Sequence, residues 1–145
     1  MTPETATIEA ACIRLQQRYG TLADRQDPTF AELFTGDAVI TLPGSPPFAG
    51  LEAIMAGQAQ WKASGVVMRH VCTNFTIEAI GEDRAEGLCD LMVFRAEPGP
   101  GQAPPYASAP VSLGEYHDVF VRLDGAWRFK SRMLRWIFRG ATAPG

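Results

Sequence analysis

The chain has 145 residues, of which 46% are hydrophobic and 20% are charged, and its formal net charge at pH 7 is −3. This length and composition are typical of one soluble domain that buries its own core. The slightly acidic charge argues against a nucleic-acid-binding protein, and no apolar run is long enough to cross a membrane. Met1 is not followed by a basic and apolar leader, so we expect a cytoplasmic protein.

Cysteine and histidine content limits the chemistry that the chain can support. Cys12, Cys72 and Cys89 are widely spaced within apolar patterns, so they are predicted to be small core residues. There are only two histidines, and neither a glycine-rich phosphate loop nor a Gly-x-Ser-x-Gly motif is present. The sequence therefore predicts no metal and no cofactor.

Helical signals dominate the first half of the chain. A capped amphipathic helix is expected over 2–25, a short second helix from 27 to about 36, and a third helix over 50–65 with Trp61 on its apolar face. A short strand is expected at 38–42, before a run rich in proline and glycine.

The second half changes to strict alternation of apolar and polar residues. Four strands are predicted, at about 66–78, 85–95, 111–123 and 126–138, and Asp124-Gly125 is a strong hairpin signal between the last two. Helices followed by consecutive strands predict a single α+β domain over 1–145. We expect three N-terminal helices packed in the concave face of a strongly curved, mainly antiparallel sheet, which leaves a partly empty cone.

A proline-rich segment, 97–110, links the second and third of these strands. Its prolines prevent sheet pairing, and it is interpreted either as a mobile hairpin loop or as a lid over a pocket with Tyr106 as its aromatic contact. Residues 139–145 form a short tail.

The strand at 66–78 carries the first candidate site residue. Alternation places Met68, His70 and Asn74 on one face, where polar and apolar side chains mix as they do in a ligand cavity. The alternative is a structural histidine that makes its hydrogen bonds within the core.

The strand at 111–123 carries Tyr116 and Asp118 on one face and His117 on the other. Periodicity alone does not decide which of these faces points inward. An inward aspartate needs a partner, because an isolated buried carboxylate is costly, and His70 or Tyr116 could provide it.

Asp24 ends the first helix, and the helical wheel argues against an inward position. At 100° per residue it lies about 140° from Tyr19, away from the apolar stripe, so a straight helix would direct it to solvent.

Several stretches together resemble a known family. They are Ala23-Asp24-Arg25-Gln26-Asp27, Leu33-Phe34-Thr35-Gly36-Asp37, Phe48-Ala49-Gly50-Leu51, Arg69-His70, and Tyr116-His117-Asp118 leading into Leu123-Asp124-Gly125-Ala126-Trp127. The chain resembles the SnoaL-like branch of the nuclear-transport-factor-2-like (cystatin-like) superfamily over nearly its whole length. This cone hosts many activities, so the resemblance is more specific for fold than for function.

The resemblance implies a site like those of scytalone dehydratases and bile-acid 7α-dehydratases. It implies that Asp24 and His70 form an acid–base pair with Tyr19 beside them, and it overrules the helical-wheel argument. We expect the substrate-binding residues to be Tyr116, Asp118, Asn74, Trp61 and Met68. The second catalytic histidine of the scytalone dehydratases has no equivalent, because Val111 to Leu113 occupy that region.

Two functional hypotheses follow. The first is a cofactor-independent lyase or isomerase that acts on an oxygenated cyclic small molecule in a hydrophobic cone. The second is a non-catalytic domain of the same fold that binds a lipophilic small molecule or dimerises. In both cases a homodimer is expected, from the habit of the family and from apolar residues on both sheet faces.

Overall fold

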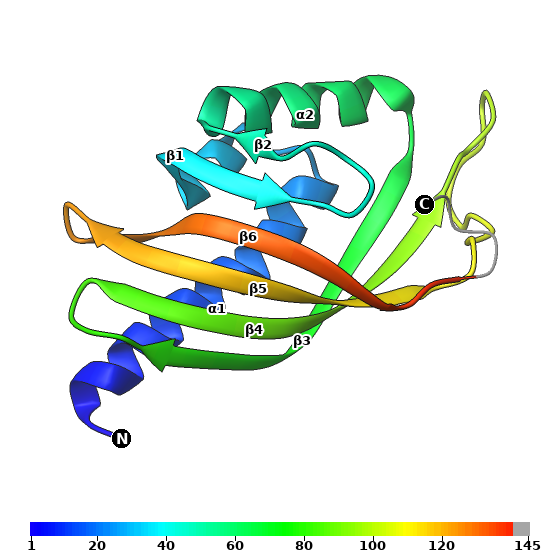
Figure 1. Ribbon diagram of the computed structural model, residues 1–145. Helices are drawn as coiled ribbons and strands as arrows, with labels where there is room; N and C mark the ends of the chain where they lie inside the picture. Colours follow the sequence, from blue (N-terminus) through cyan, green and yellow to red (C-terminus); the bar gives the residue numbers. More distant parts are fainter. Residues whose placement is uncertain (141–145) are drawn as a thin grey trace.

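A computed structural model describes residues 1–140 (Figure 1). The elements in chain order are α1 (Pro3–Asp24), the 3-10 helix η1 (Pro28–Leu33), β1 (Phe34–Thr41), β2 (Phe48–Ala49), α2 (Leu51–Ser64), β3 (Val67–Ala79), β4 (Arg84–Ala96), β5 (Ser112–Leu123) and β6 (Ala126–Phe138). The predicted helices and strands are therefore found, with two differences in kind: the second helix is a 3-10 helix, and the short strand β2 was not predicted. The predicted tail begins at 139, and its residues 141–145 lie outside the described part of the chain.

Local sequence signals explain where the helices begin and end. The Thr2 hydroxyl accepts a hydrogen bond from the Thr5 amide at 3.1 Å, and Pro3 takes the first helical position, where a missing N–H costs nothing. Gly65 ends α2 with φ of +73°, a left-handed conformation that glycine adopts without strain. Among residues 1–140, no helix is long and apolar enough to cross a membrane.

All six strands form one mixed sheet in the order β2-β1-β6-β5-β4-β3. The β1 and β6 strands are parallel, and the other neighbours are antiparallel. The sheet curves, with α1 packed chiefly against β3 and α2 against β1 and β2 (Figure 1). This arrangement is an α+β cone with helices from the N-terminal part of the chain.

The first strand begins earlier than the sequence predicts. We expected the second helix to continue to about residue 36 and the strand to begin at 38, but β1 begins at Phe34. Phe34 pairs with Phe129 of β6, and its ring lies 5.6 Å from the Phe129 ring. Packing of these two aromatic side chains favours the extended conformation over another turn of helix.

A bulge in β3 changes which residues face inward. Asn74 has φ of +54°, and the pairing of β3 with β4 shifts between Thr73 and Thr76. Simple alternation therefore holds only as far as Cys72, and beyond the bulge Phe75 and Ile77 are the inward residues.

Candidate functional site

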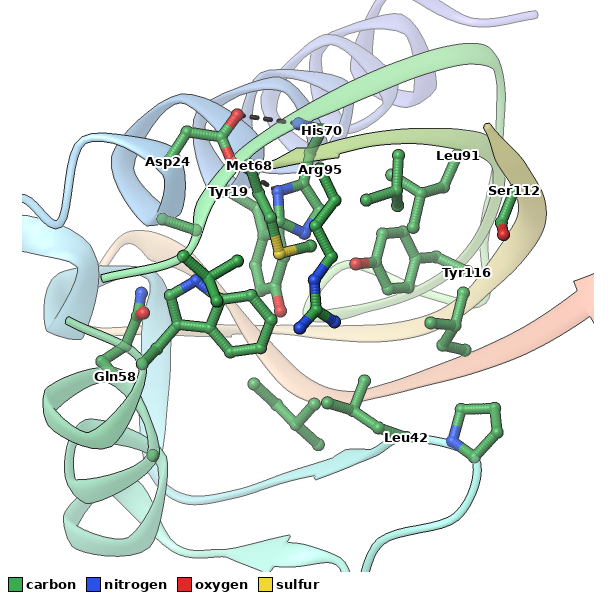
Figure 2. A pocket seen from close by; sticks show the side chains of 18 of the residues that line it. Tyr19, Asp24, Leu42, Gln58, Met68, His70, Leu91, Arg95, Ser112 and Tyr116 are labelled. Atoms are coloured by element: carbon green, nitrogen blue, oxygen red, sulfur yellow. Dashed lines mark hydrogen bonds and ion pairs between the residues drawn. The ribbon is translucent and has the colours of Figure 1, made fainter. Parts of the chain in front are cut away.

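A cavity of about 320 Å³ lies between α1, α2 and the inner face of the sheet (Figure 2). Most of the side chains that line it are apolar, including Ile40, Leu91 and Leu134. A few polar groups interrupt this lining, as is usual in sites for small organic ligands. Among the predicted site residues, the lining includes Tyr19, Asp24, Trp61, Met68, His70 and Tyr116.

Asp24 and His70 form a hydrogen-bonded pair in the wall of the cavity. The carboxylate Oδ1 lies 2.5 Å from His70 Nδ1, and Oδ2 accepts a hydrogen bond from the His70 backbone amide at 2.8 Å. The side chains are 3% and 14% exposed for Asp24 and His70, respectively. Since a carboxylate is an acceptor, the pair places the imidazole proton on Nδ1 and leaves Nε2 as the acceptor of the neutral ring.

Asp24 faces inward because α1 has a second buried stripe. Gln16 and Gly20 are both buried and lie eight and four residues before Asp24, so the three share one helix face. A Cβ on Gly20 would come within 3.0 Å of His70 Cβ, so glycine permits the close approach of α1 to β3 beside the pair. The helical wheel misled because it followed only the apolar stripe and ignored these polar and small residues.

Two tyrosines form part of the cavity wall. Tyr19 and Tyr116 have ring centroids 5.6 Å apart, and the Tyr19 ring lies 6.1 Å from the His70 ring. Burial raises the pKa of both hydroxyls above the ordinary value of 10.0, although the positive charge of Arg132 opposes this rise. Both side chains therefore remain protonated donors near neutral pH.

The predicted partners of Asp118 are wrong. Asp118 faces inward, with His117 on the outer face, but its carboxylate binds Arg132 through Nε at 2.7 Å and Nη2 at 2.9 Å. Gln16 Nε2 donates a third hydrogen bond at 3.0 Å. The side chains of both ion-pair partners are fully buried and are not part of the cavity lining, so Asp118 lies behind the pocket wall.

Arg132, which was not expected from the sequence to be a site residue, lies between aromatic rings. Its guanidinium carbon is 3.7 Å from the Tyr116 ring centroid, 4.2 Å from that of Tyr19 and 4.6 Å from that of Phe129. Burial alone would lower the pKa of this guanidinium, but its neighbours, chiefly the Asp118 carboxylate, raise it. Arg132 thus supports both pocket tyrosines from behind.

Asn74 does not lie in the cavity, which corrects its predicted place beside His70. The bulge turns it outward, where it is exposed and donates a hydrogen bond to Asp90 Oδ2 at 2.7 Å. Tyr106, the predicted aromatic contact of the proline-rich loop, lies in a separate depression formed within residues 96–107. From that loop, Ala109 and Pro110 line the main cavity instead.

Arg95 was also missed, although a signal for it exists. Leu91 and Val93 line the cavity from β4, and alternation continues this inner face to Arg95, which is a lining residue too. Within residues 1–140, no group of three or more His, Cys, Asp or Glu side chains is arranged to hold a metal ion.

Comparison with known proteins agrees with this architecture. The chain matches the SnoaL-like domain over residues 4–133, and it belongs to this family. No curated protein sequence matches it.

Similar solved structures cover nearly the whole chain. A candidate scytalone dehydratase from Novosphingobium aromaticivorans has a TM-score of 0.84 at 20% identity, over 100% of this chain and 95% of that one. The hexachlorocyclohexane dehydrochlorinase LinA-type3 from Novosphingobium barchaimii has a TM-score of 0.78 at 19% identity, covering 97% and 94%. A variant of Rv3472 from Mycobacterium tuberculosis, described as of unknown function, has a TM-score of 0.76 at 29% identity, covering 94% and 76%.

Proposed function

We propose that the protein is a cofactor-independent lyase or isomerase that uses Asp24 and His70 as an acid–base pair on an oxygenated cyclic small molecule. The observation that carries this proposal is the 2.5 Å contact between Asp24 and His70 Nδ1 in the wall of a largely apolar cavity. Structural neighbours described as a candidate scytalone dehydratase and a dehydrochlorinase share the cone and support the reaction class by analogy.

The first step is removal of a proton from carbon. His70 Nε2 accepts a proton from the carbon next to a carbonyl group, and the C–H electron pair moves into the developing enolate. Asp24 stabilises the imidazolium that forms and keeps the ring oriented. Acid–base assistance of this kind contributes about 10²- to 10⁴-fold to a rate.

The second step decides between elimination and isomerisation. In a dehydration, the enolate pair forms a carbon–carbon double bond while the bond to the leaving hydroxyl breaks. That oxygen takes a proton from the imidazolium, or from a tyrosine that the imidazolium then reprotonates, so that water leaves and neutral His70 is restored. In an isomerisation, the imidazolium returns its proton to a different carbon. Tyr19 and Tyr116 are suited to donate to the enolate oxygen because burial keeps their hydroxyls protonated.

Trp61 and Met68 are assigned to substrate binding, since both line the same cavity as the pair. Asp118 is assigned an indirect role, because it holds Arg132 behind the two tyrosines. Asn74 receives no role in the pocket.

The experiment is a turnover assay on a panel of cyclic hydroxyketones, cyclic enones and chlorinated cyclohexanes. We expect the wild type to convert at least one class and His70→Ala to lose activity by about 10²-fold or more. The matched control is His117→Ala, which removes the other histidine, on the outer sheet face. Equal activity of His70→Ala and the wild type would eliminate the proposal.

A second candidate function is non-catalytic binding of a lipophilic molecule. The observation that favours it is the mainly apolar lining of the cavity, within which Asp24 and His70 would be only a satisfied polar pair. Saturable binding of the panel compounds without any turnover would support this alternative.

We also propose that the protein forms a homodimer through the outer face of its sheet. Val71, Phe94 and Met133 are exposed hydrophobic residues on the outer face of the sheet, and Ile137 is exposed near the end of β6. Such exposed residues are typical of an interface with a second copy of the chain. Light scattering of the purified protein measures this directly, and a monomer at all concentrations would refute it.

A further inference from the structure

One cation lies in the cavity wall without a role in the proposed chemistry. Arg95 is the only lysine or arginine among the described residues that line the cavity. Figure 2 shows its guanidinium directed into the pocket on the side of His70 and Tyr116. Its position follows from the alternation of β4, since Leu91 and Val93 are the preceding inward residues.

The surroundings of Arg95 leave several of its hydrogen-bond donors without an acceptor among the described residues. Nη2 donates to Glu97 Oε1 at 2.8 Å, and no hydrogen bond from Nε or Nη1 is found within residues 1–140. The Glu97 side chain is 71% exposed, whereas that of Arg95 is 30% exposed. An ion pair with so exposed a carboxylate is weak, so a ligand can displace it at little cost.

Two contacts hold Arg95 at this place. The backbone amide of Ala109 donates to the Arg95 carbonyl at 2.9 Å, which ties the end of β4 to the proline-rich segment. The guanidinium also lies 6.0 Å from the ring of Trp61, which belongs to the opposite wall formed by α2. The backbone of Arg95 is therefore anchored at the edge of the pocket, and its guanidinium lies near an aromatic ring of the opposite wall.

Charge within the cavity favours an anionic ligand. Among the described residues that line the cavity, Asp24 is the one with a carboxylate, and it is occupied by His70, so it does not neutralise Arg95. A planar guanidinium binds a carboxylate through two parallel hydrogen bonds, and an apolar, partly dehydrated wall strengthens such a contact.

We propose that Arg95 is a specificity-determining residue and that the ligands of this pocket are apolar ring compounds that carry a carboxylate or a similar anionic group. The ring occupies the apolar space before His70, and the anionic group binds Arg95 on the more exposed side in place of Glu97. Such a ligand is a substrate only if the proposed function holds, but binding of the ligand to Arg95 does not require turnover.

The test uses two fluorescent probes that differ only in one anionic group. These are 8-anilinonaphthalene-1-sulfonate and its uncharged analogue N-phenyl-1-naphthylamine. Fluorescence titration of the wild type should show saturable binding of both, with each displacing the other. Arg95→Gln should weaken binding of the sulfonate about tenfold and change binding of the neutral probe less than about twofold.

Two variants serve as controls of opposite kind. Arg84→Gln removes a cation from the far end of β4 that also pairs with a glutamate two residues later, and it should alter neither affinity. Glu97→Gln removes the competing carboxylate and should tighten binding of the sulfonate alone.

Three results would overturn the proposal. The first is an equal loss of affinity for both probes in Arg95→Gln, and the second is no loss of affinity for either. The third is failure of the sulfonate to bind the wild type or to compete with the neutral probe. Failure of the proposed function is a separate result. It would be shown by full turnover in His70→Ala, and it would not change the affinity of the wild type or of Arg95→Gln for either probe.

Discussion

Within residues 1–140, two aspartates face inward, each bound to a nitrogen-containing side chain, and their surroundings differ. Asp24 binds His70 in the wall of the cavity, whereas Asp118 binds Arg132 in a fully buried site behind that wall. The first pair has a base whose second nitrogen can reach a ligand. The second pair has a permanent cation enclosed by aromatic rings. We infer that access to the cavity, and not the presence of a buried carboxylate, is what suits the Asp24–His70 pair to the proposed acid–base role.

The largest expected effect comes from changing the accessible pair. Asp24→Asn removes the negative charge that stabilises the imidazolium and orients the ring, so turnover should fall about 10²- to 10⁴-fold while the fold is retained. The matched control is Asp27→Asn, because Asp27 caps η1 outside the cavity lining and asparagine caps equally well. Equal activity of Asp24→Asn and this control would contradict the assignment.

A stability loss is expected from breaking the buried pair. Arg132→Met leaves the Asp118 carboxylate buried with only Gln16 as a hydrogen-bond donor, so the free energy of unfolding should fall by about 3–5 kcal/mol. Urea denaturation measures this difference. The double variant Asp118→Leu/Arg132→Met should recover part of the loss, because no unpaired charge remains. A single variant as stable as the wild type would show that the pair contributes no stability.

The pocket tyrosines predict how stability depends on alkaline pH. Their folded-state pKa values are raised above 10.0 by burial, so the unfolded chain loses these protons first. Their contribution to the free energy of unfolding is complete below about pH 10 and is lost as the pH rises through their folded-state pKa values. In Tyr106→Phe, which retains only these two tyrosines, phenolate absorbance should rise together with unfolding measured by circular dichroism. Phenolate absorbance that rises while the protein is still folded would refute this.

Most of the fold could be predicted because its periodicities are local. Helical spacing predicted the helices, and alternation with the Asp124-Gly125 signal predicted the strands and the last hairpin. Asp124 and Gly125 adopt the positive φ angles that this turn requires. The inward position of Asp24 came from the family resemblance and not from the helix pattern.

The partners of Asp118 and the position of Asn74 could not be predicted, because they depend on two irregularities of the sheet. A regular hairpin closed at 124–125 would pair Asp118 with Ser131, but a register shift between Val119 and Phe120 brings Arg132 opposite Asp118 instead. The bulge at Asn74 likewise ended the alternation that had placed this residue beside His70. One extra residue reverses every later side chain in a strand, and no short-range pattern in the chain announces it. Arg95, in contrast, lies where alternation places it.

The proposed acid–base role of Asp24 and His70 is tested most directly by locating the proton on the His70 ring. The claim is that Asp24 holds this proton on Nδ1, so that Nε2 faces the cavity as a base. Long-range proton–nitrogen NMR in alkaline buffer distinguishes the two tautomers of the neutral ring. We expect a protonated Nδ1 and an unprotonated Nε2 in the wild type, and loss of this preference in Asp24→Asn. A proton on Nε2 of the wild-type ring would contradict this claim.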